Sequence, residues 1–177
     1  MGMFRHLIRG TIAALFLCAM TGIAMADDAV ARCGELPEPV ADKHRAILVA
    51  AGSGDLEALA ALTDSEFTYS FGDGEGALAY WQRLRDEEGV DAASLIVGLS
   101  DAGCTHYDEG GDQFYVWPAA GLIDYIDLTP DEIEALQTVY DGELVDWYVE
   151  GFAVGYYVGW RYYIEPDGRW AAFVAGD

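Results

Sequence analysis

The sequence predicts an α+β fold, with N-terminal helices packed on a curved antiparallel sheet that ends in a C-terminal β-hairpin. Apolar residues recur at helical spacing in the first half of the chain, from Val40 onward. Apolar and polar residues alternate on both sides of Pro166-Asp167-Gly168, as they do in a hairpin. A chain of 177 residues, 53% of them hydrophobic, can bury the core of one domain, which excludes a disordered protein.

Residues 1–26 have the pattern of a secretory signal peptide. A basic start with Arg5 and Arg9 precedes an apolar run over residues 11–24, and small residues follow it. This run is shorter than the ~20 residues that span a bilayer, which favours cleavage over a membrane anchor. We therefore expect an exported bacterial protein of the periplasm or the extracellular space, with one α+β domain over residues 27–177.

Two cysteines, Cys33 and Cys104, follow the signal peptide. In an exported chain, two cysteines most simply form one disulfide. A redox-active or metal-binding pair is the alternative, but the chain has no C-x-x-C spacing and no histidine cluster beside both cysteines. We expect a disulfide.

The net charge of −22 limits the partners of this protein. It disfavours nucleic acid, whose phosphates need basic residues, and it disfavours anionic membranes. We therefore expect no nucleic acid partner, and no membrane partner once the signal peptide is cleaved. Adaptation to a saline or periplasmic environment explains the charge, and a basic partner protein or a cationic ligand is the more specific explanation.

The first half of the domain is expected to contain an extended start, two helices and a strand. The first helix begins near Val40 and ends at Gly52-Ser53-Gly54. Asp55 caps a second, short helix, and the alternation over residues 66–71 predicts a strand. The positions expected to be buried are Val40, His44, Ile47, Leu48, Ala51, Leu56, Leu59, Leu62, Phe67, Tyr69 and Phe71.

The middle of the domain is expected to contain three more helices and two strands. A third helix follows the glycine-rich loop at 72–76, and Asp91 caps a fourth. A polar turn over residues 108–112 separates strands at 104–107 and 113–117. Residues 129–132, Thr-Pro-Asp-Glu, begin a fifth helix with a capping box. The positions expected to be buried are Leu78, Trp81, Leu84, Leu95, Ile96, Leu99, Ile133, Leu136 and Val139.

The C-terminal hairpin is expected to consist of strands at 155–165 and 169–174. The even-numbered residues of its first strand are apolar or aromatic and should fill the core, namely Tyr156, Val158, Trp160, Tyr162 and Ile164. The odd-numbered residues should share the opposite face, namely Tyr157, Arg161, Tyr163 and Glu165.

Three residues of that opposite face are the candidate ligand-binding site. Tyr157 and Tyr163 can stack on a flat ligand or a sugar, and Arg161 between them can hold a carboxylate or a phosphate with two parallel hydrogen bonds. The alternative is an ordinary surface on which Arg161 pairs with Glu165 or another acidic residue.

Several stretches resemble an uncharacterised family of secreted proteobacterial proteins. These are FTYSFGDGEGALAYW at 67–81, FYVWP at 114–118, LTPDEIEAL at 128–136 and GWRYYIEPDGRWAAFVAGD at 159–177. That resemblance implies export but no activity. The stretch VAAGSGDLEALAALTDSEFTYSF at 49–71 and the hairpin that ends in DGRW are also similar to nuclear-transport-factor-2-like domains. This second resemblance implies helices packed into a curved sheet around a pocket. Enzymes of that class often place an Asp/His pair there, which has no match in this sequence.

His106 is the candidate for a catalytic residue, because an imidazole beside Asp108 and Glu109 can act as a general base. The alternative is a strand histidine that one carboxylate satisfies. His44, on an apolar helix face, is expected to be a core histidine with one hydrogen-bond partner. The acidic residues around Gly110-Gly111 lack EF-hand spacing, and the loop at 72–76 lacks a phosphate-binding Lys-Ser/Thr, so we expect no metal and no cofactor.

Three hypotheses on function follow. The first is a periplasmic binding module that holds a small ligand against the aromatic sheet, with Arg161 as its polar anchor. The second is an interaction or inhibitor module whose acidic surface binds a basic protein. The third is a hydrolase or isomerase of the nuclear-transport-factor-2-like type, in which His106 or His44 faces a carboxylate across a cavity.

Overall fold

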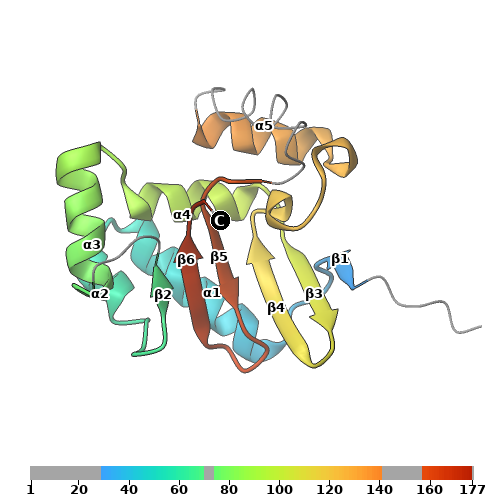
Figure 1. Cartoon of the computed structure of the whole chain (residues 1–177), viewed down its shortest axis with the longest axis horizontal. Coiled ribbons are helices and arrows are strands. Elements are labelled where there is room, and N and C mark those ends of the chain that lie inside the picture. Colours follow the sequence, from blue (N-terminus) through green and yellow to red (C-terminus); the bar gives the residue numbers. More distant parts are fainter. Residues whose placement is uncertain (1–28, 70–73, 141–156, 177) are drawn as a thin grey trace, which may run out of the picture.

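The computed structural model describes residues 29–69, 74–140 and 157–176, and these form the predicted α+β fold (Figure 1). One six-stranded sheet has the strand order β1-β3-β4-β5-β6-β2. The predicted signal peptide lies outside the described residues, as do Phe71 and Tyr156. The strands are β1 (Val30–Arg32), β2 (Thr68–Tyr69), β3 (Thr105–Glu109), β4 (Asp112–Trp117), β5 (Arg161–Ile164) and β6 (Trp170–Val174).

Five α-helices and three short helical segments accompany the sheet in the described part of the chain. The α-helices are α1 (Glu38–Gly52), α2 (Leu56–Ala60), α3 (Ala77–Arg83), α4 (Ala92–Asp101) and α5 (Pro130–Val139). The short segments are a π-helical turn at Leu84–Glu88 and 3₁₀ turns at Ala119–Gly121 and Tyr125–Asp127. None of the three was predicted from the sequence.

The sheet is mixed, which corrects the prediction of a wholly antiparallel one. Strands β1, β3, β4, β5 and β6 pair antiparallel in turn, but β2 pairs parallel with β6 through Thr68 and Ala172. The sequence between β2 and β6 includes α3, α4 and α5, and such long connections allow a strand to join an edge in either direction. In Figure 1, α1 lies behind the sheet, and α5 lies above α4 at one end of it.

One face of the sheet carries the main core, and we call it the inner face. Its strand residues Tyr162, Ile164 and Phe173 are fully buried, as are Val40 and Ile47 of α1. The predicted core positions in the first four helices are largely confirmed: Leu56, Leu59, Trp81, Leu84, Ile96, Leu99 and Ala51 are buried, while Leu48, Leu62, Leu78 and Leu95 pack partly buried against them. The prediction of a buried even-numbered face is thus confirmed for Tyr162 and Ile164, whereas Val158 and Trp160 are half-buried and precede β5.

The helix starts follow the capping residues that the sequence shows. The side chain of Asp55 accepts a hydrogen bond from the Ala58 amide, and that of Asp91 accepts one from Ala93. At α5 both halves of the capping box form between Thr129 and Glu132. A second, smaller core lies beside α5 and contains Ala102, Ala119, Ala120, Leu128, Leu136 and Tyr157.

Both hairpins differ in detail from the prediction. The hairpin of β3 and β4 turns on Gly110 and Gly111 alone, and both have positive φ (67° and 101°), which the mirror-image turns of tight hairpins require. Its strands therefore run further into the polar segment than expected. In the C-terminal hairpin, the first strand begins only at Arg161, and the described residues 157–160 are not part of the sheet.

The predicted disulfide between Cys33 and Cys104 is present. It joins the segment after β1 to the residue before β3, and the Cys33 amide also donates to the Cys104 carbonyl at 2.9 Å. The predicted extended start is therefore an edge strand that one covalent bond and a sheet register hold in place.

Candidate functional site

Arg161 and Tyr163 lie on the other face of the sheet, which we call the outer face. Arg161 Nε donates to the Tyr163 hydroxyl at 2.7 Å, and Nη1 donates to the Gly159 carbonyl at 3.3 Å. The aliphatic part of the Arg161 side chain lies beside Gly121. A Cβ atom added to Gly121 would lie 3.6 Å from Cδ of Arg161. Both side chains are half-buried. The guanidinium of the half-buried Arg161 is thus oriented by neutral groups.

Arg161 has no carboxylate within 4.0 Å among the residues that the structure describes. The predicted alternative, a pair with Glu165, is not formed, because Glu165 accepts hydrogen bonds from Arg169 instead. Every other arginine in the described residues pairs with an acidic residue: Arg32 with Glu132, Arg45 with Asp42, Arg83 with Glu75, Arg85 with Asp86, and Arg169 with Glu165.

An aromatic row leads across the outer face to Arg161. The rings of Tyr107 and Phe114 stack with their centroids 6.5 Å apart, and Phe114 meets Tyr163 edge-to-face at 6.2 Å. All three side chains are half-buried. Tyr107 and Phe114 are opposite each other in the β3–β4 register, which their alternation with polar neighbours could have indicated in the sequence. The row offers apolar ring area beside one cation.

Tyr157 does not share that face, which corrects the prediction that it lies beside Arg161 and Tyr163 on one strand face. Tyr157 is 5% exposed and belongs to the smaller core. Its hydroxyl lies 2.9 Å from that of Tyr140 and donates to the Trp160 carbonyl. The chain bends before β5, and the Trp160 amide donates to Tyr140 rather than to a strand neighbour. Regular alternation therefore ends at Arg161.

Burial raises the pKa of Tyr140 to about 12, although its hydrogen bonds and the nearby charge of Arg161 favour the phenolate. Tyr140 consequently remains a neutral hydroxyl at physiological pH. Tyr140 therefore places no negative charge beside the guanidinium of Arg161.

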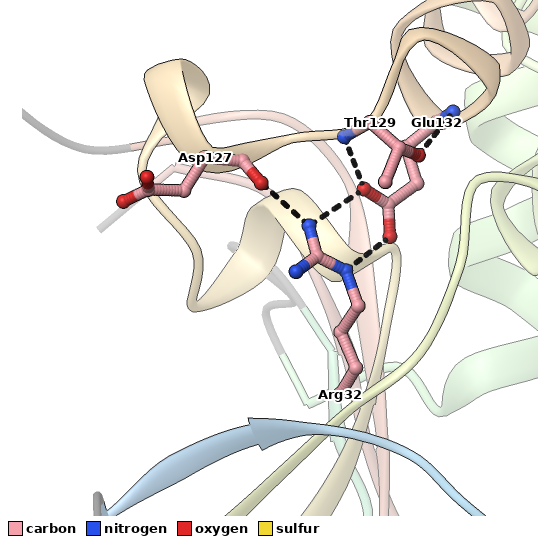
Figure 2. A network of polar contacts seen from close by, with 4 residues as sticks. All are labelled: Arg32, Asp127, Thr129 and Glu132. Carbon is pink, nitrogen blue, oxygen red and sulfur yellow. Dashed lines mark hydrogen bonds and ion pairs between the residues drawn. The ribbon is translucent and has the colours of Figure 1, made fainter.

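Arg32, also on the outer face, makes the opposite kind of contact (Figure 2). Its Nε and Nη2 each donate to one oxygen of Glu132 at 3.0 Å, and Nη2 also donates to the Asp127 carbonyl at 2.6 Å. Glu132 accepts a further hydrogen bond from the Thr129 amide at 2.7 Å. Burial opposes ionisation of Glu132, but the hydrogen bonds from Arg32 and Thr129 outweigh it and lower the pKa of this carboxyl. This pair joins β1 to the start of α5.

The two candidate histidines have no carboxylate partner within the described ranges. His106 stacks on Tyr115 at 4.6 Å, and its buried Nε2 has no hydrogen-bond partner. Asp108 and Glu109 instead bind Gln113 and Tyr107. The histidine–carboxylate pair of the third hypothesis is therefore not formed there.

His44 is satisfied within the protein, as predicted, but by two partners rather than one. Its Nε2 lies 3.0 Å from Ser100 Oγ and 3.1 Å from the Tyr162 hydroxyl. Its ring stacks on Trp117 at 4.4 Å. Burial lowers the pKa of His44, which keeps the ring neutral at physiological pH. The contacts join α1, α4 and β5.

Within residues 29–69, 74–140 and 157–176, no three His, Cys, Asp or Glu side chains gather as metal ligands do, and no helix there has the length and hydropathy of a membrane span. Searches of the chain against protein-family models, curated proteins and solved structures give no match.

Proposed function

We propose that this protein is an exported binding module that holds a small ligand against the outer face of its sheet. The ligand has a carboxylate that Arg161 binds and a flat apolar part that contacts Tyr163 and Phe114. The observation that carries this proposal is the guanidinium of Arg161, which has no carboxylate within 4.0 Å in the described part of the chain while the other five arginines there each have one.

Charge makes this observation informative. The chain contains 31 acidic residues against 9 lysines and arginines, so a surface arginine readily meets a carboxylate. At Arg161 the neighbours are the Tyr163 hydroxyl, the Gly159 carbonyl and the backbone at Gly121 instead. A half-buried guanidinium held by neutral groups keeps donors for an incoming planar anion.

The overall negative charge does not prevent such binding. Repulsion between the protein and a monovalent ligand is screened within about 8 Å at physiological ionic strength. At contact distance the local cation and the aromatic row determine the interaction. This favours a small, singly charged ligand over a polyphosphate.

The experiment is an NMR titration of the ¹⁵N-labelled protein with benzoate, in which the arginine side-chain Nε resonances are followed. We expect benzoate to shift the Nε resonance of Arg161, because the ligand approaches that guanidinium. Benzamide, which has the same ring without the charge, serves as the neutral control. Equal shifts with both compounds contradict recognition of the carboxylate.

Two matched variants locate the site. Arg161→Gln removes the proposed anchor, and Arg45→Gln removes an exposed arginine that Asp42 pairs with. We expect benzoate binding to weaken at least tenfold in Arg161→Gln, as loss of a charge-assisted bidentate contact implies, and to stay unchanged in Arg45→Gln. Equal affinity in both variants would remove the assignment of this site.

The disulfide Cys33–Cys104 supports the export component of this proposal, because disulfides persist in oxidising compartments. The resemblances to secreted proteobacterial proteins and to nuclear-transport-factor-2-like domains agree with export and with ligand binding. Mass spectrometry of the protein from its own host tests export, since cleavage after Ala26 gives an N-terminus at Asp27.

A further inference from the structure

We propose that the groove between α4 and α5 binds a basic amphipathic helix of a partner protein. This site is separate from Arg161, which does not line the groove. The two helices run in opposite directions, because Gly98 in α4 lies beside Val139 and Gly103 lies beside Glu132. In Figure 1 they lie one above the other at one end of the sheet.

The groove has an apolar floor. A Cβ at Gly98 would lie 2.5 Å from Val139 Cγ2, so the missing side chain lets α5 approach α4 closely there. Leu95 and Val139 line the groove, and its volume is about 920 Å³. Val97, also in the lining, is 36% exposed and is one of three exposed large aliphatic side chains among the described residues, with Val49 and Ile126. Burial of such an apolar surface against apolar side chains of a partner is favourable in free energy.

Acidic residues from both helices border this floor. Asp91 and Asp101 stand on the α4 side, and Asp131 and Glu134 stand on the α5 side. No lysine, arginine or histidine is among the lining residues. Asp101, Asp131 and Glu134 are exposed, and none of them forms an ion pair with a described residue.

The chemistry of the lining identifies the occupant. An apolar floor between two acidic borders fits a helix with apolar side chains at i, i+3, i+4 and i+7 and lysines or arginines on either side of that stripe. α4 and α5 have 10 residues each and are therefore about 15 Å long, which matches three turns of such a helix. A second copy of this chain is disfavoured, because it carries the same net charge of −22.

The test uses a fluorescein-labelled synthetic peptide of 14 residues with leucines at the apolar positions and lysines elsewhere. Fluorescence anisotropy measures its binding to the disulfide-bonded protein, and the same peptide with glutamates in place of lysines is the control. We expect the lysine peptide to bind and its affinity to fall as salt is raised, while the glutamate peptide does not bind.

Matched variants separate the groove from general attraction to an acidic protein. Asp131→Asn with Glu134→Gln removes two charges from the groove, and Glu57→Gln with Glu87→Gln removes two exposed charges that do not line it. We expect the first pair to weaken binding about tenfold and the second less than twofold. Val97→Glu places a carboxylate on the apolar floor. If charge alone attracted the peptide, this variant would bind the lysine peptide more tightly. Because the leucines need an apolar floor, we expect weaker binding, and tighter binding would contradict the inference.

Each other outcome overturns the inference. Equal weakening in both double variants means that the peptide binds the protein's charge and not the groove. No binding by the lysine peptide means that the groove is closed to such a partner, whether by residues of this chain or otherwise. Because these measurements use no anionic ligand and leave Arg161 unchanged, their failure does not affect the proposed carboxylate site.

Discussion

Arg32 and Arg161 lie on the same face of one sheet but have opposite surroundings. Arg32 is held by both oxygens of Glu132, and Arg161 is held by a tyrosine hydroxyl and a backbone carbonyl. Helix α5 presents Glu132 to the first arginine through a capping box, whereas glycine and aromatic residues surround the second. An excess of acidic residues thus does not by itself pair every described arginine with a carboxylate. Arg32 joins β1 to α5 through a carboxylate, whereas Arg161 is held only by neutral groups among the described residues.

The largest effect on this comparison is expected from removal of the disulfide. Cys33→Ser with Cys104→Ser frees the segment beside Arg32 from β3. For a sequence separation of 71 residues, the loop-entropy model gives a loss of about 4 kcal/mol in the free energy of unfolding. Urea denaturation of the oxidised protein and the variant measures this loss. Identical midpoints would show that the edge strand does not depend on the bond.

The second largest loss of stability is expected from removal of the carboxylate that pairs with Arg32. Glu132→Gln removes the charge that accepts two hydrogen bonds from the guanidinium, and we expect the free energy of unfolding to fall by about 2 kcal/mol. The control is Glu134→Gln, an exposed change on the same helix that should cost less than about 0.5 kcal/mol. Equal losses in the two variants would contradict the stabilising role of the pair.

The pH dependence of stability sharpens the same contrast. The pKa of Glu132 is lowered in the folded protein, so the unfolded state binds its proton first as the pH falls. The contribution of Glu132 is present above its ordinary pKa of 4.5 and is lost as the pH falls through the folded value. We expect the stability difference between the wild type and Glu132→Gln to shrink below pH 4.5. A difference that stays constant into that acid range would assign it to packing instead.

The smallest effect on stability is expected at Arg161. Arg161→Gln removes no ion pair with a described carboxylate but loses the hydrogen bonds to Tyr163 and Gly159, so the free energy of unfolding should fall by only about 0.5–1 kcal/mol. Arg32→Gln, by comparison, should lose about 1–2 kcal/mol, because it leaves Glu132 without its partner. Thermal denaturation of both variants under one condition tests this order. A larger loss at Arg161 would show that it is a structural residue.

Local features of the fold could be predicted from the sequence, and features that depend on distant contacts could not. Thr129 and Glu132 are three residues apart, so the capping box could be found without knowledge of the rest of the chain. The alternation of Tyr162 and Ile164 predicted the buried face for the same reason. The parallel pairing of β2 with β6 joins Thr68 to Ala172, and nothing in either segment indicates that partner.

In the candidate site, too, contacts between neighbours in the sequence could be predicted and contacts between distant residues could not. Arg161 and Tyr163 were predicted together because they are two residues apart on one strand, and the structure places them in contact. Tyr157 was assigned to the same face by extending the alternation backwards, but Tyr140, 17 residues earlier, binds its hydroxyl in another core. Phe114 reaches Tyr163 only through the pairing of β4 with β5. A single sequence does not reveal such contacts.

The position of β6 in the sheet has a consequence for the time at which this protein can fold. β6 is formed by residues 170–174, and it lies between β5 and β2. Until a ribosome has made those residues, β2 has no neighbour in the sheet, and Trp170 and Phe173 are missing from the core against which α3 packs. The sheet and the core against which α3 packs are therefore completed only once residues 170–174 have been synthesised.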